Sequence, residues 1–173
     1  MKLVPWVPTP QSIIIDILKT AGLKRGEVLY DLGCGDGRVV IVAVKHFGAK
    51  AVGVEIDEQL AMRAVENIKK EGIEEKAEII VGDMFNVNVS KADVVYMYLL
   101  TRVNEMLKKK LERELKEGSR VITLDFSIPG WTPILSKKLW DGVTFRTVNL
   151  YVIGVSDKKS IERRINVRNL SYT

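Results

Sequence analysis

The sequence predicts an α/β fold: a Rossmann-like, doubly wound and mostly parallel sheet with helices on both faces and a C-terminal antiparallel strand pair. Apolar runs rich in valine and isoleucine alternate with helical stretches along the chain. A glycine-rich turn follows the first of these runs, and acidic side chains stand at the ends of three successive runs. Strands covered on both faces have such continuous apolar runs, so the alternation favours a parallel sheet.

Strands and helices are expected in alternation. The strands are predicted at residues 27–33, 49–56, 77–83, 92–99 and 119–126. The helices are predicted at residues 11–21, 37–47, 58–71 and 102–116. Most of the strands show little alternation of apolar and polar residues, as buried parallel strands must. After Trp140, the run GVTFRTVNLYVIGV predicts two adjoining strands with no helix between them, which would form the antiparallel pair.

The length and charge of the chain predict one domain with a basic tail. With 173 residues, the chain is long enough to bury a proper core within a single domain. Residues 1–155 are expected to form this domain, and residues 156–173 the tail. The tail holds five lysines and arginines against two acids, and so accounts for three of the five net positive charges. We interpret it as a solvated end; binding to nucleic acid or to an acidic protein surface is the alternative.

Cysteine usage and hydropathy predict a cytoplasmic protein with no membrane partner. Cys34 is the only cysteine, so no disulfide can form within the chain, which is typical of a reducing compartment. No apolar run approaches the roughly 20 residues that a membrane-spanning helix needs. The sequence has neither the spacing of a metal site nor a Ser, His and Asp set for covalent catalysis. We expect no metal, and a monomer is favoured.

The segment DLGCGDG at residues 31–37 carries the first functional signal. Glycines between a strand and a helix let backbone amides approach a ligand, and the helix N-terminus offers unpaired N–H groups. A dinucleotide-binding fingerprint needs its third glycine where this chain has Arg38. Asp31 and Asp36 also place negative charge where a pyrophosphate would lie. The segment therefore predicts a ligand that carries positive charge.

S-adenosylmethionine fits this requirement, since it carries a sulfonium and an ammonium group. Glu55 ends the second predicted strand about 20 residues beyond the glycines, the spacing at which a carboxylate binds ribose hydroxyls. Asp83 ends the third predicted strand and could accept a hydrogen bond from the adenine amino group. Ligands of open α/β sheets bind at these strand ends, so the acids favour a cofactor site over a purely structural turn.

The motifs DLGCGDG, GVEID and GDMF together resemble those of the class I, seven-stranded methyltransferases that use S-adenosylmethionine. The resemblance extends over residues 9–155 and implies S-adenosylmethionine as the cofactor. The residues that it assigns to cofactor binding are Thr9, Asp31, Gly33, Gly35, Asp36, Glu55, Ile56, Asp83 and Met84. These motifs say little about the methyl acceptor.

Three further segments, VPWVPTPQSII, YMYLLTRVNEML and LDFSIPGWTP, resemble the small archaeal protein-lysine methyltransferases of broad specificity, which are related to the non-SET histone-lysine enzymes. This resemblance implies that residues 1–21 close over the cofactor, with Thr9 at its methionyl part. The residues implied to line an aromatic acceptor channel are Tyr96 and Tyr98 on one face at the end of the fourth strand, and Phe126 and Trp131 in the segment at the end of the fifth. For Tyr96 and Trp131, a packing role is an equal alternative.

The expected reaction is in-line methyl transfer to lysine amines exposed on protein substrates, including proteins associated with nucleic acid. Displacing a neutral thioether needs positioning and loss of solvent more than acid catalysis. An RNA or small-molecule acceptor, or a binding protein without catalysis, remains an alternative. Against nucleic acid, the chain has YMYLLT where an exocyclic-amine enzyme would carry Asn or Asp, two prolines and an aromatic residue. A cytosine C5 enzyme would need a nucleophilic cysteine, and Cys34 lies in the cofactor loop.

Overall fold

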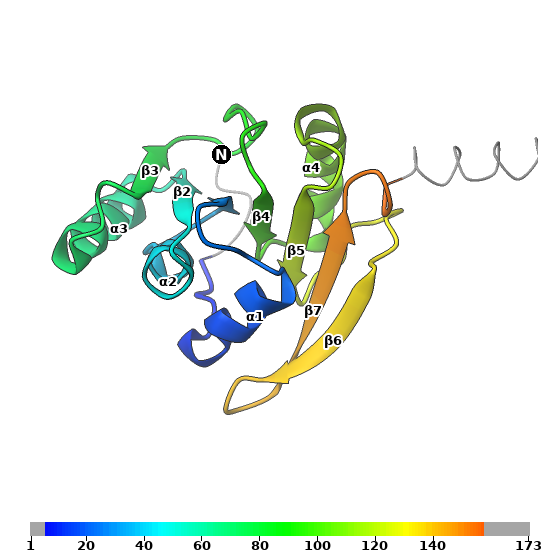
Figure 1. The fold of residues 1–173 in the computed structure, drawn as a ribbon, viewed down its shortest axis with the longest axis horizontal. Coiled ribbons are helices and arrows are strands. Elements are labelled where there is room, and N and C mark those ends of the chain that lie inside the picture. The colour runs from blue at the N-terminus through cyan, green and yellow to red at the C-terminus, as the bar shows by residue number, and fades with distance from the viewer. Residues whose placement is uncertain (1–5, 158–173) are drawn as a thin grey trace, which may run out of the picture.

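Seven strands form one sheet in the order β3-β2-β1-β4-β5-β7-β6 in the computed structural model, which describes residues 6–157 (Figure 1). The strands are β1 (Val28–Leu32), β2 (Lys50–Glu55), β3 (Ala77–Val81), β4 (Val94–Met97), β5 (Arg120–Leu124), β6 (Leu135–Trp140) and β7 (Phe145–Val152). The helices are η1 (Gln11–Ile13), α1 (Ile14–Thr20), α2 (Arg38–Phe47), α3 (Glu58–Glu71) and α4 (Thr101–Glu114). The first five strands pair in parallel, whereas β7 runs antiparallel to β5 and β6. The predicted fold class is confirmed.

Two buried clusters lie on the two faces of this sheet. Successive residues of a strand point to opposite faces. In β4, Val94 and Tyr96 belong to one cluster, whereas Val95 and Met97 belong to the other. The first cluster includes side chains of α1, α2 and α3, and the second includes side chains of α4; Figure 1 shows α1 and α2 close together. The inner strands are therefore covered on both faces, which explains their continuous apolar runs.

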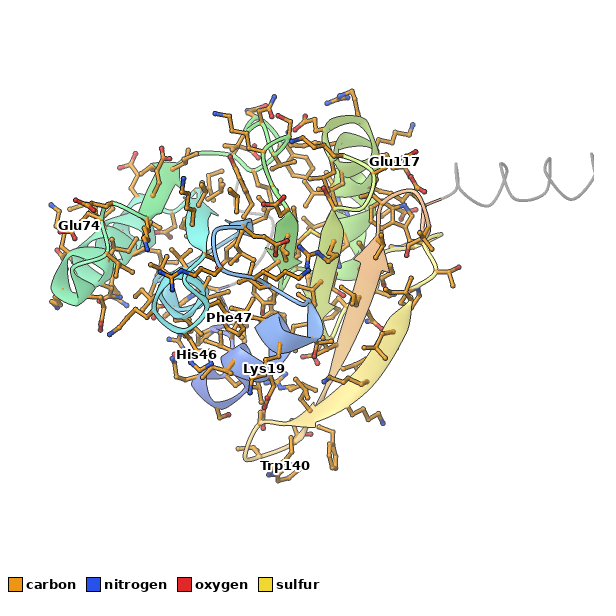
Figure 2. All side chains as sticks on the ribbon, in the orientation of Figure 1. Lys19, His46, Phe47, Glu74, Glu117 and Trp140 are labelled. Atoms are coloured by element: carbon orange, nitrogen blue, oxygen red, sulfur yellow. The ribbon has the colours of Figure 1, made fainter. Side chains whose placement is uncertain are left out.

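The antiparallel pair begins earlier in the chain than predicted. The run after Trp140 contains one strand, β7, rather than two, because its partner β6 precedes the turn at residues 141–144. All but one of the β6 residues are exposed, among them Lys137 and Lys138. A strand at the edge of the sheet with little buried surface carries no apolar pattern that a sequence reading could detect. Trp140 projects outward near the tip of this hairpin (Figure 2) and is 55% exposed.

The last two described residues, which the sequence assigns to the tail, pack against the domain. Ser156 and Asp157 are both buried. The Ser156 hydroxyl accepts a hydrogen bond from Val152 N at 3.1 Å, and its carbonyl accepts one from Thr132 N at 3.1 Å. The rest of the predicted basic tail, from residue 158 onward, lies outside the described residues, as do residues 1–5.

The described residues contain no candidate for a membrane span, since none of their helices is both long and apolar enough. Residues 6–157 also bring no three His, Cys, Asp or Glu side chains together in the manner of a metal site. Cys34 is a free, buried thiol in the turn after β1.

Candidate active site

The turn between β1 and α2, residues 33–37, is the glycine loop of the candidate site. The amides of Gly33 and the next residue donate to the Val54 carbonyl at 2.8 and 3.0 Å, which ties this loop to the end of β2. Gly35 adopts a φ of 55°, a left-handed conformation, and a Cβ there would clash with the indole of Trp6. Only glycine meets both conditions, and it lets the Trp6 indole approach the loop backbone closely.

Asp31, the fourth residue of β1, places a buried carboxyl beside the glycine loop. Its exposed fraction is 3%. Burial is the main cause that raises the pKa of Asp31 to about 8, and the neighbouring carboxylates of Glu55 and Asp36 add to it. A cation bound next to Asp31 would favour the ionised carboxylate. A bound cation would therefore lower the pKa of Asp31 and release its proton.

Glu55 joins the glycine loop to the start of α3. Its Oε2 accepts a hydrogen bond from Gly35 N at 2.9 Å, and its Oε1 accepts one from Asp57 N at 2.9 Å. The carboxylate of Asp57 in turn caps α3 by accepting from the amides of Gln59 and Leu60, each at 3.1 Å. The buried Glu55 side chain thus sets how the ends of β1 and β2 face each other.

Arg38, the first residue of α2, holds a second acid in its ionised form. Its Nε donates to Asp36 Oδ1 at 3.0 Å and its Nη2 to Asp36 Oδ2 at 2.7 Å. Burial opposes the effect, but the hydrogen bonds and charge of Arg38 keep the pKa of Asp36 below its ordinary value. Arg38 Nη1 also donates to the Thr9 carbonyl at 3.1 Å, so the same side chain anchors the N-terminal segment.

The N-terminal segment lies across this region and helps to form a cavity. The Thr9 hydroxyl is 2.7 Å from the hydroxyl of Tyr96 on β4, and both side chains are buried. The cavity is small, about 20 Å³, and it is continuous with open solvent. Residues 6–9, Asp31, parts of the glycine loop, the start of α2 and both Tyr96 and Tyr98 line it.

Tyr98, directly after β4, connects the cavity to the segment that follows β5. Its ring stacks on Phe126, with centroids 6.2 Å apart and an interplanar angle of 27°. Its hydroxyl donates to Asp125 Oδ2 at 3.3 Å and accepts from Arg146 Nη1 at 3.2 Å. The fully buried Asn104 of α4 donates through Nδ2 to the carbonyls of Phe126 and the next residue, at 3.1 and 3.2 Å. These contacts fix Tyr98 from two sides.

Most of the residues predicted for the site come together at this end of the sheet. Those that line the cavity are Thr9, Asp31, Gly33, Asp36, Tyr96 and Tyr98. Gly35 and Glu55 are joined to each other by a hydrogen bond within the same region, and Phe126 stacks on Tyr98.

None of the residues predicted for the adenosine part, Glu55 included, lines this cavity. Ile56, Asp83 and Met84 follow β2 and β3, and all three are half-buried. Asp83 Oδ1 accepts a hydrogen bond from Phe85 N at 2.9 Å, which fixes the carboxylate beside the end of β3.

Trp131 lies apart from the other residues that are predicted to line the acceptor channel. It is buried in the cluster that includes α4. Its indole Nε1 donates to Glu112 Oε1 at 3.0 Å, and its ring meets Tyr151 edge to face with centroids 5.8 Å apart. In the structure, Trp131 therefore makes packing contacts. A packing role is the alternative to channel lining that the sequence analysis leaves open for it.

The sequence reasoning does not find Asp125, Arg146 or Asn104. Asp125 directly follows β5, so the rule that singles out acids at strand ends would have found it. Arg146 approaches Tyr98 only because β7 pairs antiparallel with β5. The sequence analysis places the hairpin too late in the chain and so does not find this contact. Asn104 is a polar residue on a helix, and no local pattern distinguishes it from a solvated one.

Several known proteins are similar to this chain over most of its length. The ANTKMT methyltransferase domain family matches residues 31–135. A protein-lysine N-methyltransferase of Saccharolobus islandicus (strain REY15A) is 50% identical over 152 residues, which cover 87% of this chain and 94% of the relative. A lysine N-methyltransferase of Homo sapiens, named for a component of ATP synthase, is 36% identical over 129 residues, which cover 75% of this chain and 54% of that protein. The chain thus spans about half the length of the human relative.

A solved structure links this fold to the predicted cofactor. The RNA methyltransferase from Salinibacter ruber, in complex with S-adenosyl-L-homocysteine, is similar with a TM-score of 0.80 and 39% identity over 85% of this chain and 94% of that one. S-adenosylhomocysteine is what S-adenosylmethionine becomes when it gives up its methyl group, and the acids around the glycine loop suit the cationic form. This chain therefore belongs to the ANTKMT methyltransferase domain family and is a class I methyltransferase that uses S-adenosylmethionine.

Proposed function

We propose that this protein transfers methyl groups from S-adenosylmethionine to the side-chain amines of lysines exposed on protein substrates. The observation that carries the proposal is Tyr98, which is backed by Phe126 and lines the same cavity as Asp31. An aromatic side chain in the same cavity as a buried carboxyl suits a small aliphatic amine beside a cationic cofactor. The relatives from Saccharolobus islandicus and Homo sapiens are both named lysine N-methyltransferases, which supports the same acceptor.

The cofactor would be held by the residues that the sequence singled out. We assign Thr9, Asp31, Gly33, Gly35 and Asp36 to its methionyl half, and Glu55, Ile56, Asp83 and Met84 to its adenosine half. Buried carboxylates attract the ammonium and sulfonium groups more strongly than they would in water. The open backbone at Gly35 gives the cofactor close access, provided that the indole of Trp6 yields some of the space above it.

The chemistry asks little of the protein beyond positioning and exclusion of water. S-adenosylmethionine, when bound, supplies the methyl group: the amine lone pair forms the N–C bond, the C–S bond breaks, and its electron pair stays on sulfur. Tyr98 and Phe126 would desolvate the lysine side chain, which disfavours its ammonium form and releases a proton to solvent. Burial raises the pKa of Tyr98, so its hydroxyl stays protonated and is no general base near neutral pH.

The rate of transfer should therefore rise with pH. A free lysine has a pKa of about 10.4, so only about one in 10³ is neutral near pH 7. At saturating cofactor and limiting protein substrate, the rate follows the ionisation of the free lysine, and we expect it to increase steadily from pH 6.5 to pH 9. A rate that levels off near pH 7 would point to a dedicated base and contradict proton loss by desolvation.

We also propose that residues 1–21 close the cofactor pocket. The support is the contact of Thr9 with Tyr96 and the hydrogen bond from Arg38 to the Thr9 carbonyl. Deleting residues 1–10 should abolish methyl transfer and leave the sheet folded, because the apolar side chains of α1 remain. Transfer of a labelled methyl group and far-UV circular dichroism test the two expectations. Gln11→Ala, an exposed change beside the deletion, is the control; a truncated protein with normal turnover would rule the closure out.

RNA is the second candidate acceptor. It is favoured by the Salinibacter ruber structure, which is named as an RNA methyltransferase and is 39% identical to this chain. The residues after β4, YMYLLT, lack the Asn or Asp, two prolines and an aromatic residue expected for methylation of exocyclic amines. We therefore rank RNA and small molecules behind protein lysines.

Mass spectrometry tests the lysine assignment at single-residue level. The enzyme is incubated with cofactor carrying a deuterated methyl group and with a mixed cellular protein fraction, and peptides are then sequenced. We expect heavy methyl groups on lysine Nζ of many exposed lysines, because the cavity opens to solvent. Heavy methyl groups on other side chains but not on lysine would contradict the proposal.

A further inference from the structure

Asp125 is held in a strained conformation between the sheet and Tyr98. Its φ of 60° is the only positive value for a non-glycine residue among the described residues. Its amide donates to the Thr147 carbonyl at 2.7 Å, and its Oδ1 accepts from Thr147 N at 3.1 Å, so β7 holds it in place. Its Oδ2 faces the hydroxyl of Tyr98. Backbone strain of this kind persists where the surrounding structure requires a particular side-chain position.

Arg146 completes the arrangement from β7. Its Nη1 donates to Asp125 Oδ2 at 2.7 Å and to the Tyr98 hydroxyl at 3.2 Å. Its Nε donates to Asp141 Oδ2 at 2.7 Å, and Asp141 Oδ1 accepts from the backbone amides of the hairpin turn. The guanidinium is thus held on two sides, and it links the hairpin turn to Tyr98.

These partners fix the direction of every hydrogen bond at the Tyr98 hydroxyl. An ionised carboxylate can only accept, and a guanidinium can only donate. The Tyr98 proton must therefore point to Asp125, and one lone pair of the Tyr98 oxygen receives Arg146. What the hydroxyl can still offer to a substrate is its second lone pair.

We propose that Asp125 and Arg146 are positioning residues that make Tyr98 purely a hydrogen-bond acceptor toward the methyl-accepting amine. The proposal rests on the proposed function, in which Tyr98 contacts that amine. A neutral amine has N–H donors and one lone pair. If Tyr98 donated to that lone pair, it would block the nucleophile; because it accepts from an N–H instead, it leaves the lone pair free to face the methyl group.

The test uses substitutions at Asp125 that its backbone tolerates. Asp125→Gly fits a φ of 60° and removes the carboxylate, whereas Asp125→Asn also tolerates this conformation and keeps an oxygen acceptor. Loss of a hydrogen bond to a charged group corresponds to roughly a 10- to 100-fold change in rate. We expect Asp125→Gly to slow transfer at saturating cofactor by that factor and Asp125→Asn to restore part of the rate. The affinity for cofactor, measured by calorimetry, should stay within about twofold in both.

A double-mutant cycle with Tyr98→Phe separates action through Tyr98 from a structural effect. If Asp125 acts through this hydroxyl, then Asp125→Gly in the Tyr98→Phe background should change the rate by less than about twofold. An equally large loss in both backgrounds would overturn the inference while leaving the proposed function intact. A normal rate for Asp125→Gly, or for Tyr98→Phe alone, would also overturn it. The lysine assignment itself fails only if no label reaches lysine, which the mass spectrometry detects separately.

Discussion

Replacing Asp31 by asparagine is expected to make the protein more stable and the enzyme less able to bind its cofactor. Asp31 is almost fully buried, and burial followed by the charges of Glu55 and Asp36 raises its pKa to about 8. In the unfolded chain the same carboxyl has a pKa of about 3.9. Between these two values the folded state holds a proton that the unfolded state has lost, so the free energy of unfolding falls as pH rises.

The stabilisation should therefore depend on pH. At pH 8.5, Asp31→Asn should raise the free energy of unfolding by roughly 2 to 5 kcal/mol, since each pKa unit is worth about 1.4 kcal/mol. At pH 4, where Asp31 is protonated in the folded state, the gain should be small. Denaturant unfolding of both proteins at the two pH values measures the difference. An equal gain at both would show that Asp31 is not titrating as described.

Although Asp31→Asn should stabilise the fold, it should weaken binding of the cofactor. A carboxylate that pairs with the ammonium or sulfonium group is worth about 1.5 to 3 kcal/mol, so Asp31→Asn should weaken cofactor binding roughly 10- to 100-fold. Calorimetry at pH 7 in two buffers of different ionisation enthalpy should detect a proton released on binding to the wild type and none with Asp31→Asn. Asp36→Asn is the matched control: Arg38 keeps the pKa of Asp36 low, so proton release should persist.

Glu55→Ala should produce the second large effect, again on cofactor affinity. We expect a loss of roughly 1 to 3 kcal/mol, the range for removing one partner from buried hydrogen bonds. The physical reason is twofold: the proposed ribose contact disappears, and the amides of Gly35 and Asp57 lose their acceptor. Titration calorimetry measures the affinity, with the exposed Glu58→Ala at the start of α3 as control. Unchanged affinity in Glu55→Ala would refute the ribose assignment.

The sequence predicts this fold well where strands are covered on both faces of the sheet, and poorly at the exposed edge strand. The five parallel strands have apolar residues on both faces, and their alternation with helices specifies the doubly wound sheet. β6 lies at the edge with exposed lysines, and its pattern resembles that of a loop. The resulting error in the position of the hairpin also conceals Arg146, because its approach to Tyr98 depends on the pairing of β7 with β5.

The candidate site divides in the same way. Asp31 and Glu55 lie at the carboxyl ends of their strands, where the topology of a parallel sheet brings side chains together, so the sequence predicts both acids. Aromatic residues after a strand give no such guidance. Tyr98 and Trp131 look alike in the sequence, yet the first lines the cavity and the second packs against Tyr151.

The most direct test of the central claim is to follow where the methyl group goes. The enzyme is incubated with methyl-labelled S-adenosylmethionine and, in separate reactions, with mixed cellular protein, total RNA and a small-molecule extract. We predict that label enters protein, on lysine side chains, and that Tyr98→Phe reduces this incorporation without much change in cofactor affinity. Label that enters RNA or small molecules, with none on protein lysines, would contradict the account.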